Sequence, residues 1–267
     1  MNRLPEYDIA FLTDPGRKRR GDPNQDSVLV LPADETRDLA PLLVVADGMG
    51  GHVGGAVASQ KVVEAIAARY RQARPREDLL LLLGECLETA LEALRLHAEQ
   101  DPSMASMGST AVMAVLEEEQ VTVANVGDSR AYLIHGREMS QVSFDHSVVG
   151  DQVRLKIITP LEARSHPKRN RLTQSLSPKR TAIKPHICQV PFDKDDTLVL
   201  CSDGLWGVIP EAMLQAVAND LPTGEAVQKL VQLAINSGGP DNITVILARH
   251  AGAHPAALFG EDDATGG

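Results

Sequence analysis

The chain has 267 residues, of which 43% are hydrophobic and 23% charged, and its formal net charge is −10. This composition is ordinary for a globular protein, and the core must be aliphatic because aromatic residues make up only 3%. The acidic balance argues against non-specific binding to nucleic acid. No apolar run is long enough to cross a bilayer, and the N-terminal residues lack the apolar stretch of a signal peptide. We therefore expect a cytoplasmic protein with neither a nucleic-acid nor a membrane partner.

The first hundred residues predict three strands followed by two long helices. Strands are expected over residues 6–13, 26–32 and 42–47, the last as a buried strand of β-branched residues and Leu that ends in a glycine-rich run. Helical spacing of apolar residues then predicts helices over 56–72 and 77–99.

The period changes to that of consecutive strands between residues 108 and 142, with Gly127-Asp128 and His135-Gly136 expected as two of the turns. Strands, two long helices and then more strands are not the regular alternation of a parallel sheet. This order favours antiparallel sheets with helices packed outside them, which is an α+β fold.

The second half begins with a polar segment, 144–185, in which a locally basic stretch breaks the acidic balance of the chain. We keep two interpretations of this segment open: a solvated loop with short helices, or a flap that recruits an anionic substrate. The remaining elements are strands at 186–191 and 197–202, helices at 210–219 and 223–237, and a last strand at 242–249. We expect one domain over 1–250 and a flexible acidic tail over 251–267.

Four aspartates stand where an apolar strand meets a turn: Asp47, Asp128, Asp203 and Asp241. Carboxylates at the edge of an apolar core repel one another unless a positive charge lies among them. Oxygen ligands of this kind suit Mg²⁺ or Mn²⁺. A single aspartate of this kind is commonly a turn residue that caps its own backbone, and spacing alone does not show that the four converge.

Six short segments resemble, in order, the motifs of the PP2C-type (PPM) serine/threonine phosphatases in their bacterial form. The segments are Thr13-Asp14-Pro15-Gly16 with Asn24-Gln25-Asp26, Val45-Ala46-Asp47-Gly48-Met49-Gly50-Gly51-His52, Gly108-Ser109-Thr110, Asn125-Val126-Gly127-Asp128-Ser129-Arg130, Cys201-Ser202-Asp203-Gly204-Leu205 and Gly239-Pro240-Asp241-Asn242-Ile243-Thr244-Val245. Each motif alone is weak, but the ordered set is specific. The resemblance spans about residues 6–250 and implies an αββα sandwich, two antiparallel sheets flanked by helix pairs.

The resemblance also implies a site with two Mn²⁺ or Mg²⁺ ions. In it, Asp47 bridges the two ions, the Gly48 carbonyl binds one of them, and Asp203 and Asp241 hold the other. Asp128, together with Asp203, resembles the third-metal site of bacterial members. Asp26 is implied to hold metal-bound water, and Asn242 to support Asp241. In this mechanism a metal-activated water attacks phosphorus directly, and the substrates are phosphorylated proteins, products of a Ser/Thr kinase.

Two positions depart from the family pattern. Family members place a phosphate-binding Arg shortly before the Asn of Asn24-Gln25-Asp26; here the run Arg17-Lys18-Arg19-Arg20 offers several candidates, of which Arg19 and Arg20 are favoured. Eukaryotic relatives carry a proton-donating His where Met49 stands, and Met donates no proton. We interpret the neighbouring His52 as structural.

Two alternative functions are weighed against this reading. The segment Asp193-Lys194-Asp195-Asp196-Thr197 matches the DxDx[TV] pattern of haloacid-dehalogenase-type phosphatases, in which Asp193 and Asp195 would do the chemistry. That chemistry needs a parallel strand before the first Asp, whereas here an acidic hairpin turn is expected. The other alternative is a catalytically weak binding module of the PP2C fold, against which all the expected metal carboxylates are present.

Overall fold

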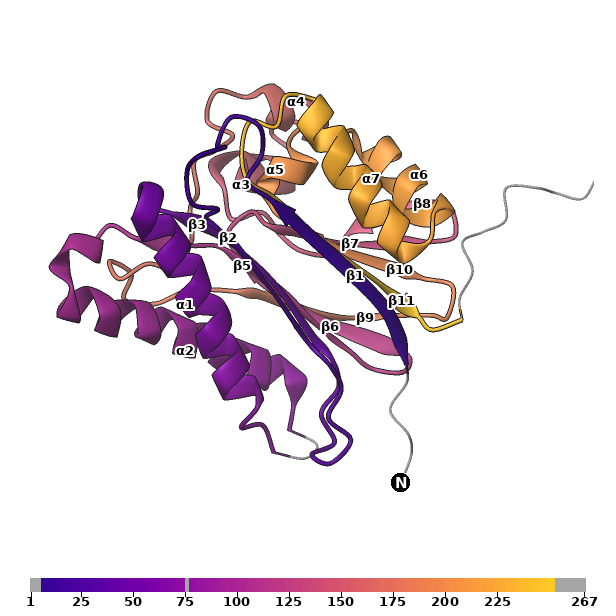
Figure 1. Cartoon of the computed structure of the whole chain (residues 1–267), viewed down its shortest axis with the longest axis horizontal. Helices are drawn as coiled ribbons and strands as arrows, with labels where there is room; N and C mark the ends of the chain where they lie inside the picture. The colour runs from indigo at the N-terminus through magenta and orange to yellow at the C-terminus, as the bar shows by residue number, and fades with distance from the viewer. Residues whose placement is uncertain (1–5, 75–76, 253–267) are drawn as a thin grey trace, which may run out of the picture.

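The structure, a computed structural model, describes residues 6–74 and 77–252. Two antiparallel sheets pack face to face, and helices cover the outer face of each (Figure 1). The first sheet has five strands in the order β1 (Tyr7–Asp14), β11 (Ile243–His250), β10 (Thr197–Cys201), β7 (Arg130–His135) and β8 (Glu138–Gln141). The second runs β2 (Asp26–Leu31), β3 (Leu42–Met49), β5 (Ala111–Leu116), β6 (Gln120–Val126) and β9 (His186–Pro191), with the short β4 (Gly108–Ser109) paired to β3.

The helices fall into two packing groups and a peripheral pair. Helices α1 (His52–Tyr70) and α2 (Leu79–Gln100) cover the second sheet, and a 3₁₀ turn, η1 (Pro102–Met104), follows them. Helices α5 (Asp203–Trp206), α6 (Glu211–Asp220) and α7 (Thr223–Asn236) cover the first sheet. The short α3 (Val148–Arg154) and α4 (Pro160–Ser165) lie in the polar segment 144–185. None of the helices in the described ranges combines the length and the apolar character needed to cross a bilayer.

Alternating side chains along the strands build three layers of core. In β3, Leu42, Val44 and Ala46 face α1 and α2, whereas Leu43 and Val45 face the opposite sheet. Successive residues of a strand point to opposite faces, so a strand buried on both faces reads as a continuous apolar run. Because each fully buried aliphatic side chain contributes about 1.5–3 kcal/mol, these layers hold the sandwich together. The αββα arrangement expected from the sequence is confirmed.

Most predicted elements are present, with boundaries that differ by a few residues. The helix expected at 56–72 begins earlier, at His52, and the four-residue helix α5 was not expected at all. The predicted limits of the domain (1–250) and of the tail (251–267) stay predictions, because residues 253–267 lie outside the described part of the chain.

Two connections predicted as turns within a sheet instead pass between the sheets. The Gly127-Asp128 turn links β6 in the second sheet to β7 in the first, and the Asp193–Asp196 turn links β9 to β10 in the same way. The hairpin prediction was therefore wrong for both, because local turn chemistry does not say which sheet the next strand joins. The turn at His135-Gly136 is the predicted hairpin, with His135 opposite Glu138.

Close backbone packing at the end of β3 gives a test of the fold. A Cβ on Gly48 would lie 2.0 Å from the Gly55 carbonyl oxygen and 2.6 Å from that of Gln25, so backbone would have to move. We expect Gly48→Ala to lower the free energy of unfolding by about 2 kcal/mol or more, measured by urea denaturation without metal. Gly224→Ala is the control, since no atom lies within 4 Å of that Cβ and Ala favours the helix by up to about 1 kcal/mol. Equal effects of the two substitutions would contradict the packing.

Candidate metal centre

Five predicted carboxylates come together where the strands of both sheets reach one end of the sandwich. Asp26 at the start of β2 is the register partner of Asp47 near the end of β3. Asp128 follows β6, Asp203 follows β10, and Asp241 precedes β11. Because the strands are antiparallel, the ends of β3 and β10 lie beside the starts of β2 and β11, which brings residues far apart in sequence to one place.

Asp26 is buried, and only one of its carboxylate oxygens is hydrogen-bonded. Its Oδ2 accepts from the hydroxyls of Ser202 and Thr244, both at 2.7 Å, while its Oδ1 is buried without a hydrogen-bond partner among the described residues. Burial, with a smaller contribution from the charges of Asp203 and Asp241, raises the pKa of Asp26 to about 7. An unpartnered buried oxygen on an acidic group is an acceptor that needs a ligand.

Backbone contacts fix Asp47 and Gly48 at the end of β3. The Asp47 amide donates to the Thr110 hydroxyl at 3.0 Å, and the Asp47 carbonyl accepts from the Thr110 amide at 2.8 Å. The Gly48 amide donates to the Gln25 carbonyl at 3.0 Å. This bonding from both neighbouring segments holds the Asp47 carboxylate at the end of the sandwich.

The carboxylates influence one another strongly. Burial first, and then repulsion from Asp26, Asp203, Asp128 and Asp241, raises the pKa of Asp47 well above its usual range. Burial and Asp241 raise the pKa of Asp203 to about 6, opposed by a hydrogen bond with Asp47 and by Arg169 and Arg19. Burial and then Asp203 raise the pKa of Asp128. These effects place all the carboxylates in one electrostatic group with a shortage of positive charge.

Asp241 and Asn242 connect the centre to the loop after β1. Asn242 accepts at Oδ1 from the Gln25 amide, 2.9 Å away, and donates from Nδ2 to the Pro15 carbonyl, also at 2.9 Å. The Asp241 carboxylate is partly exposed and pairs with the Arg19 guanidinium, 3.2 Å from Nε to Oδ1. Arg20 forms a main-chain bridge with Asp22.

The donor set fits a hard divalent cation. It consists of carboxylates and peptide carbonyls, the ligands that Mg²⁺ and Mn²⁺ prefer. The raised pKa values of Asp26 and Asp203 show that the charged carboxylates lack compensation, and Arg19 beside Asp241 supplies one positive charge among them. The side chain of His52 is outside what the structure describes, so its structural role stays a prediction.

The cluster of contacts around Arg130, beside the centre, was not predicted from the sequence. The guanidinium of Arg130, only 12% exposed, pairs with Asp145 at 2.7 Å and lies 3.6 Å over the Trp206 ring. The Trp206 indole in turn donates to the Asp128 carbonyl at 3.0 Å. A further arginine, Arg164 of α4, donates to the Trp206 and Ile209 carbonyls at 2.6 and 2.7 Å. Arg130 stands in one of the quoted motifs, but nothing in the sequence indicates its partners.

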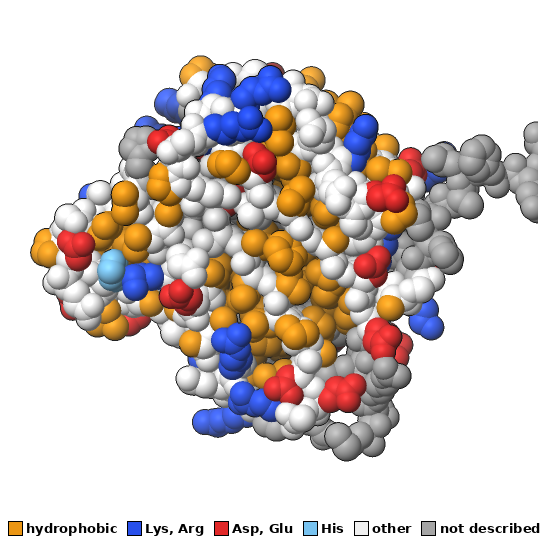
Figure 2. Space-filling model, viewed as in Figure 1, with side chains coloured by type: hydrophobic (Ala, Val, Ile, Leu, Met, Phe, Trp, Pro, Cys, Tyr) orange, Lys and Arg blue, Asp and Glu red, His pale blue; other side chains and the backbone are white. Residues whose placement is uncertain are grey.

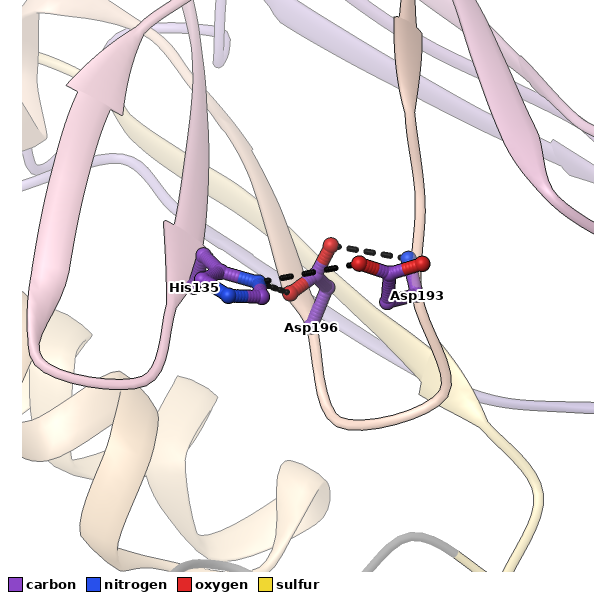
Figure 3. Close-up of side chains that lie close together, drawn as sticks. All are labelled: His135, Asp193 and Asp196. Carbon is purple, nitrogen blue, oxygen red and sulfur yellow. Dashed lines mark hydrogen bonds and ion pairs between the residues drawn. The ribbon is translucent and has the colours of Figure 1, made fainter.

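The Asp193 motif forms a structural turn before β10 (Figure 3), at the opposite end of that strand from Asp203. Buried Asp196 accepts from His135 Nδ1 at 2.7 Å with one oxygen and from the Asp193 amide at 2.8 Å with the other. Asp193 follows β9, which pairs antiparallel with β6. The haloacid-dehalogenase alternative, with Asp193 and Asp195 as catalytic residues, therefore lacks the parallel strand that it requires.

Comparison with known proteins gives one consistent result. The sequence profile of a family described as Protein phosphatase 2C matches residues 14–249. The serine/threonine phosphatase stp of Listeria innocua is 36% identical over 246 residues, covering 89% of this chain and 93% of the relative. The structure of serine/threonine phosphatase Stp1 from Staphylococcus aureus aligns with a TM-score of 0.85 and 32% identity, over 94% of this chain and 98% of that one.

A third similar structure is the catalytic domain of the serine/threonine protein phosphatase PstP in complex with two manganese ions. It aligns with a TM-score of 0.78 and 30% identity, and covers 91% of this chain and 97% of that chain. The protein therefore belongs to the protein phosphatase 2C family, whose members are metal-dependent enzymes. It is a metal-dependent protein serine/threonine phosphatase, as the resemblance implied.

The raised pKa values predict an unusual pH dependence of stability. An aspartate in the unfolded chain titrates near pH 4, whereas Asp26 and Asp203 hold their protons to about pH 7 and 6 in the folded chain. The folded state then binds more protons, so the melting temperature of the metal-free protein should fall as pH rises from about 4 to 7. Mn²⁺ should remove this fall, because metal ligands must be deprotonated.

Calorimetry in EDTA and in Mn²⁺ measures this dependence. Asp26→Asn should flatten the metal-free profile, whereas Asp195→Asn, an exposed control in the turn before β10, should leave it unchanged. A metal-free profile that rises steadily from pH 4 to 7 would contradict the assigned charges.

The Arg130 pair gives a second test. Arg130→Met leaves the Asp145 carboxylate, 8% exposed, without its charge partner, and we expect a loss of about 3–5 kcal/mol in the free energy of unfolding. Arg154→Met is the matched control, because the Arg154–Asp151 pair is exposed and such pairs contribute about 0–1 kcal/mol. Similar losses for both variants, measured by urea denaturation, would rule out this role of Arg130.

Proposed function

We propose that the chain hydrolyses phosphoserine and phosphothreonine in proteins at a centre that would hold two Mn²⁺ or Mg²⁺ ions, with Asp47 among their ligands. The Gly48 carbonyl would bind one ion, and Asp203 and Asp241 would hold the other. The observation that supports this most is the group of carboxylates whose pKa values are raised by burial and by one another. Such a group is stable in its charged form only beside cations.

A third metal at Asp128 and Asp203 is part of the proposal. Its support is that Asp203, after burial, is the largest cause of the raised pKa of Asp128. An effect of this kind means that the two carboxylates lie close together. Asp128 is also fixed at its backbone by the Trp206 indole.

When bound, the metal ions would supply Lewis acidity, which would offset the charge on the phosphoryl oxygens and lower the pKa of a water molecule so that it can lose a proton and attack phosphorus. The protein groups then orient the reactants. Asp26 Oδ1 is the acceptor with which the chain can hold a water, since Ser202 and Thr244 fix the other oxygen. Asn242 keeps Asp241 beside the loop after β1. Met49 donates no proton, so the leaving group takes its proton from solvent or another group.

Arg19 is the proposed phosphate-binding residue, ahead of Arg20 and Arg17. Its support is the contact with Asp241, which puts the guanidinium beside one of the proposed metal ligands. A planar guanidinium binds two phosphoryl oxygens at once, which a Lys does not. Figure 2 shows Lys and Arg side chains gathered at the end of the molecule where α4 and the loop after β1 lie.

The proposed substrates are phosphorylated proteins made by a Ser/Thr kinase. The similar proteins are named as serine/threonine phosphatases, and the basic residues of 144–185 would attract an anionic segment. Arg169 of this segment lowers the pKa of Asp203, so its charge acts at the centre itself. The cytoplasmic location stays a prediction from the sequence.

The test is hydrolysis of para-nitrophenyl phosphate and of a phosphothreonine peptide, with Mn²⁺ and with EDTA. We expect turnover only with metal, and a loss of at least about a hundredfold in kcat for Asp203→Asn, because the neutral amide is a poor metal ligand. Asp193→Ala is the control and should retain activity. Metal-independent turnover, or an unaffected Asp203→Asn, would overturn the mechanism, and binding of phosphopeptide without turnover would support the weak binding module instead.

A further inference from the structure

A cleft of about 1430 Å³ extends from the proposed centre along the flap, as we name residues 144–185. Asp203, Gly204 and Asp241 form part of its lining, so it is continuous with the catalytic end of the molecule. The flap forms one wall, and the segment from α5 to the start of α6 contributes to the other. A polypeptide whose phosphorylated residue reaches the centre has this cleft beside it.

Phe144 stands in the cleft as a rigid, exposed aromatic residue. Its side chain is 47% exposed, and its ring stacks on that of His186 with the centroids 4.0 Å apart. Buried Asn125 holds its backbone from both sides: Phe144 N donates to Asn125 Oδ1 at 3.1 Å, and Asn125 Nδ2 donates to the Phe144 carbonyl at 2.7 Å. Because the ring is already held in place, a ligand that packs on it loses little conformational entropy.

Other apolar residues line the same cleft as Phe144. The flap adds Leu161, which is 78% exposed, and the opposite wall adds Val208 and Pro210. Four of the ten exposed large hydrophobic side chains of the described residues lie in the flap: Phe144, Leu155, Ile157 and Leu161. Of these, Phe144 and Leu161 line the cleft, and exposed apolar side chains in a cleft are a feature of binding surfaces.

The positive charges of the flap wall favour an anionic chain in the cleft, and the exposed Phe144 ring offers a contact for an apolar side chain. Asp145 and Glu211 are paired with Arg130, and Asp151 is paired with Arg154. The exposed Arg169 and Lys184 add positive charge to the same lining. The occupant that fits both features is an extended phosphorylated segment of a protein.

We propose that Phe144, with Leu161, forms a subsite for a large apolar side chain that flanks the phosphorylated residue of the substrate. This inference rests on the proposed function, since it names a preference of the same centre. It predicts selection by one flanking position rather than general binding of phosphate. Truncating an exposed aromatic contact of this kind typically changes binding by a factor of about five to ten.

The experiment uses the full chain with Mn²⁺ and a set of phosphothreonine peptides. Each peptide carries one Phe at a different position beside the phosphothreonine and Gly at the other flanking positions. A peptide with Gly at every flanking position is the reference. We expect kcat/KM of the wild type to rise by about five- to tenfold when the Phe stands at one position. In Phe144→Ala the ratio of that peptide to the reference should fall to about one, and Leu161→Ala should lower it in part.

Phe11→Ala is the matched control, because Phe11 is 50% exposed but lies on β1, outside the cleft. This variant should keep the wild-type ratio. A flat position profile in the wild type, or an unchanged ratio in Phe144→Ala and Leu161→Ala, would overturn the subsite.

The other outcomes are separated by two measurements. If the wild type fails to hydrolyse para-nitrophenyl phosphate with Mn²⁺, the proposed function fails and not merely the subsite. If Phe144→Ala changes the mass of the particle measured by light scattering, Phe144 contacts a second copy of the chain and the subsite assignment is overturned. Because Leu161 is largely exposed, Leu161→Ala keeps the test valid even if Phe144→Ala is poorly folded.

Discussion

Repulsion among carboxylates at one end of the sandwich is the constraint on which the site depends. Asp47 lies among four other acidic groups, and burial adds the cost of removing its charge from water. Left to themselves, such side chains would turn toward solvent. The chain instead holds them in place through backbone and hydroxyl contacts, such as those of Thr110 with Asp47 and of Ser202 and Thr244 with Asp26. The binding energy of a cation is thereby available when the cation arrives, rather than being consumed in ordering the ligands.

Close backbone approach is the second requirement, and glycines meet it. A Cβ on Gly16 would lie 2.0 Å from the Asp241 carbonyl oxygen, and one on Gly204 would lie 1.9 Å from that of Asn242. Gly16 also has a φ of +75°, which residues with a side chain seldom adopt. The glycines of the motifs thus bring the loop after β1, the start of α5 and the start of β11 into contact, which positions Asp203 and Asp241 together.

Much of the fold was predictable because central strands such as β3 and β11 are buried on both faces and the helices α2 and α7 are amphipathic. The strand of Asp47 and the last strand were predicted within two residues of their observed ends. The change of sheet at Gly127-Asp128 was not, since a turn residue determines local conformation and not the partner of the next strand. The helix α5 was missed because four residues are too few for a periodic pattern.

For the site, the sequence alone supported a cation site only in outline. The placement of aspartates at strand ends indicated several carboxylates at the edge of an apolar core. The order of the motifs was needed to assign them as metal ligands. The Asp47–Asp26 pairing depends on the register of β2 and β3, and the Arg19–Asp241 contact spans 222 residues. Such contacts follow from how the strands pair and how loops approach, which no short motif contains.

The flap and the centre are mechanically connected through two arginines. Arg130 is the first residue of β7 and pairs with Asp145 at the start of the flap. Its guanidinium also packs on the ring of Trp206, which stands three residues after Asp203. Arg164 reaches from α4 to the carbonyls of Trp206 and Ile209. A displacement of the flap would therefore strain buried charge pairs beside the carboxylates, and such pairs are costly to break. The wall of the cleft is in this way held in a defined position relative to the proposed metal ligands, and a substrate segment lying along it would be presented to them at a defined distance.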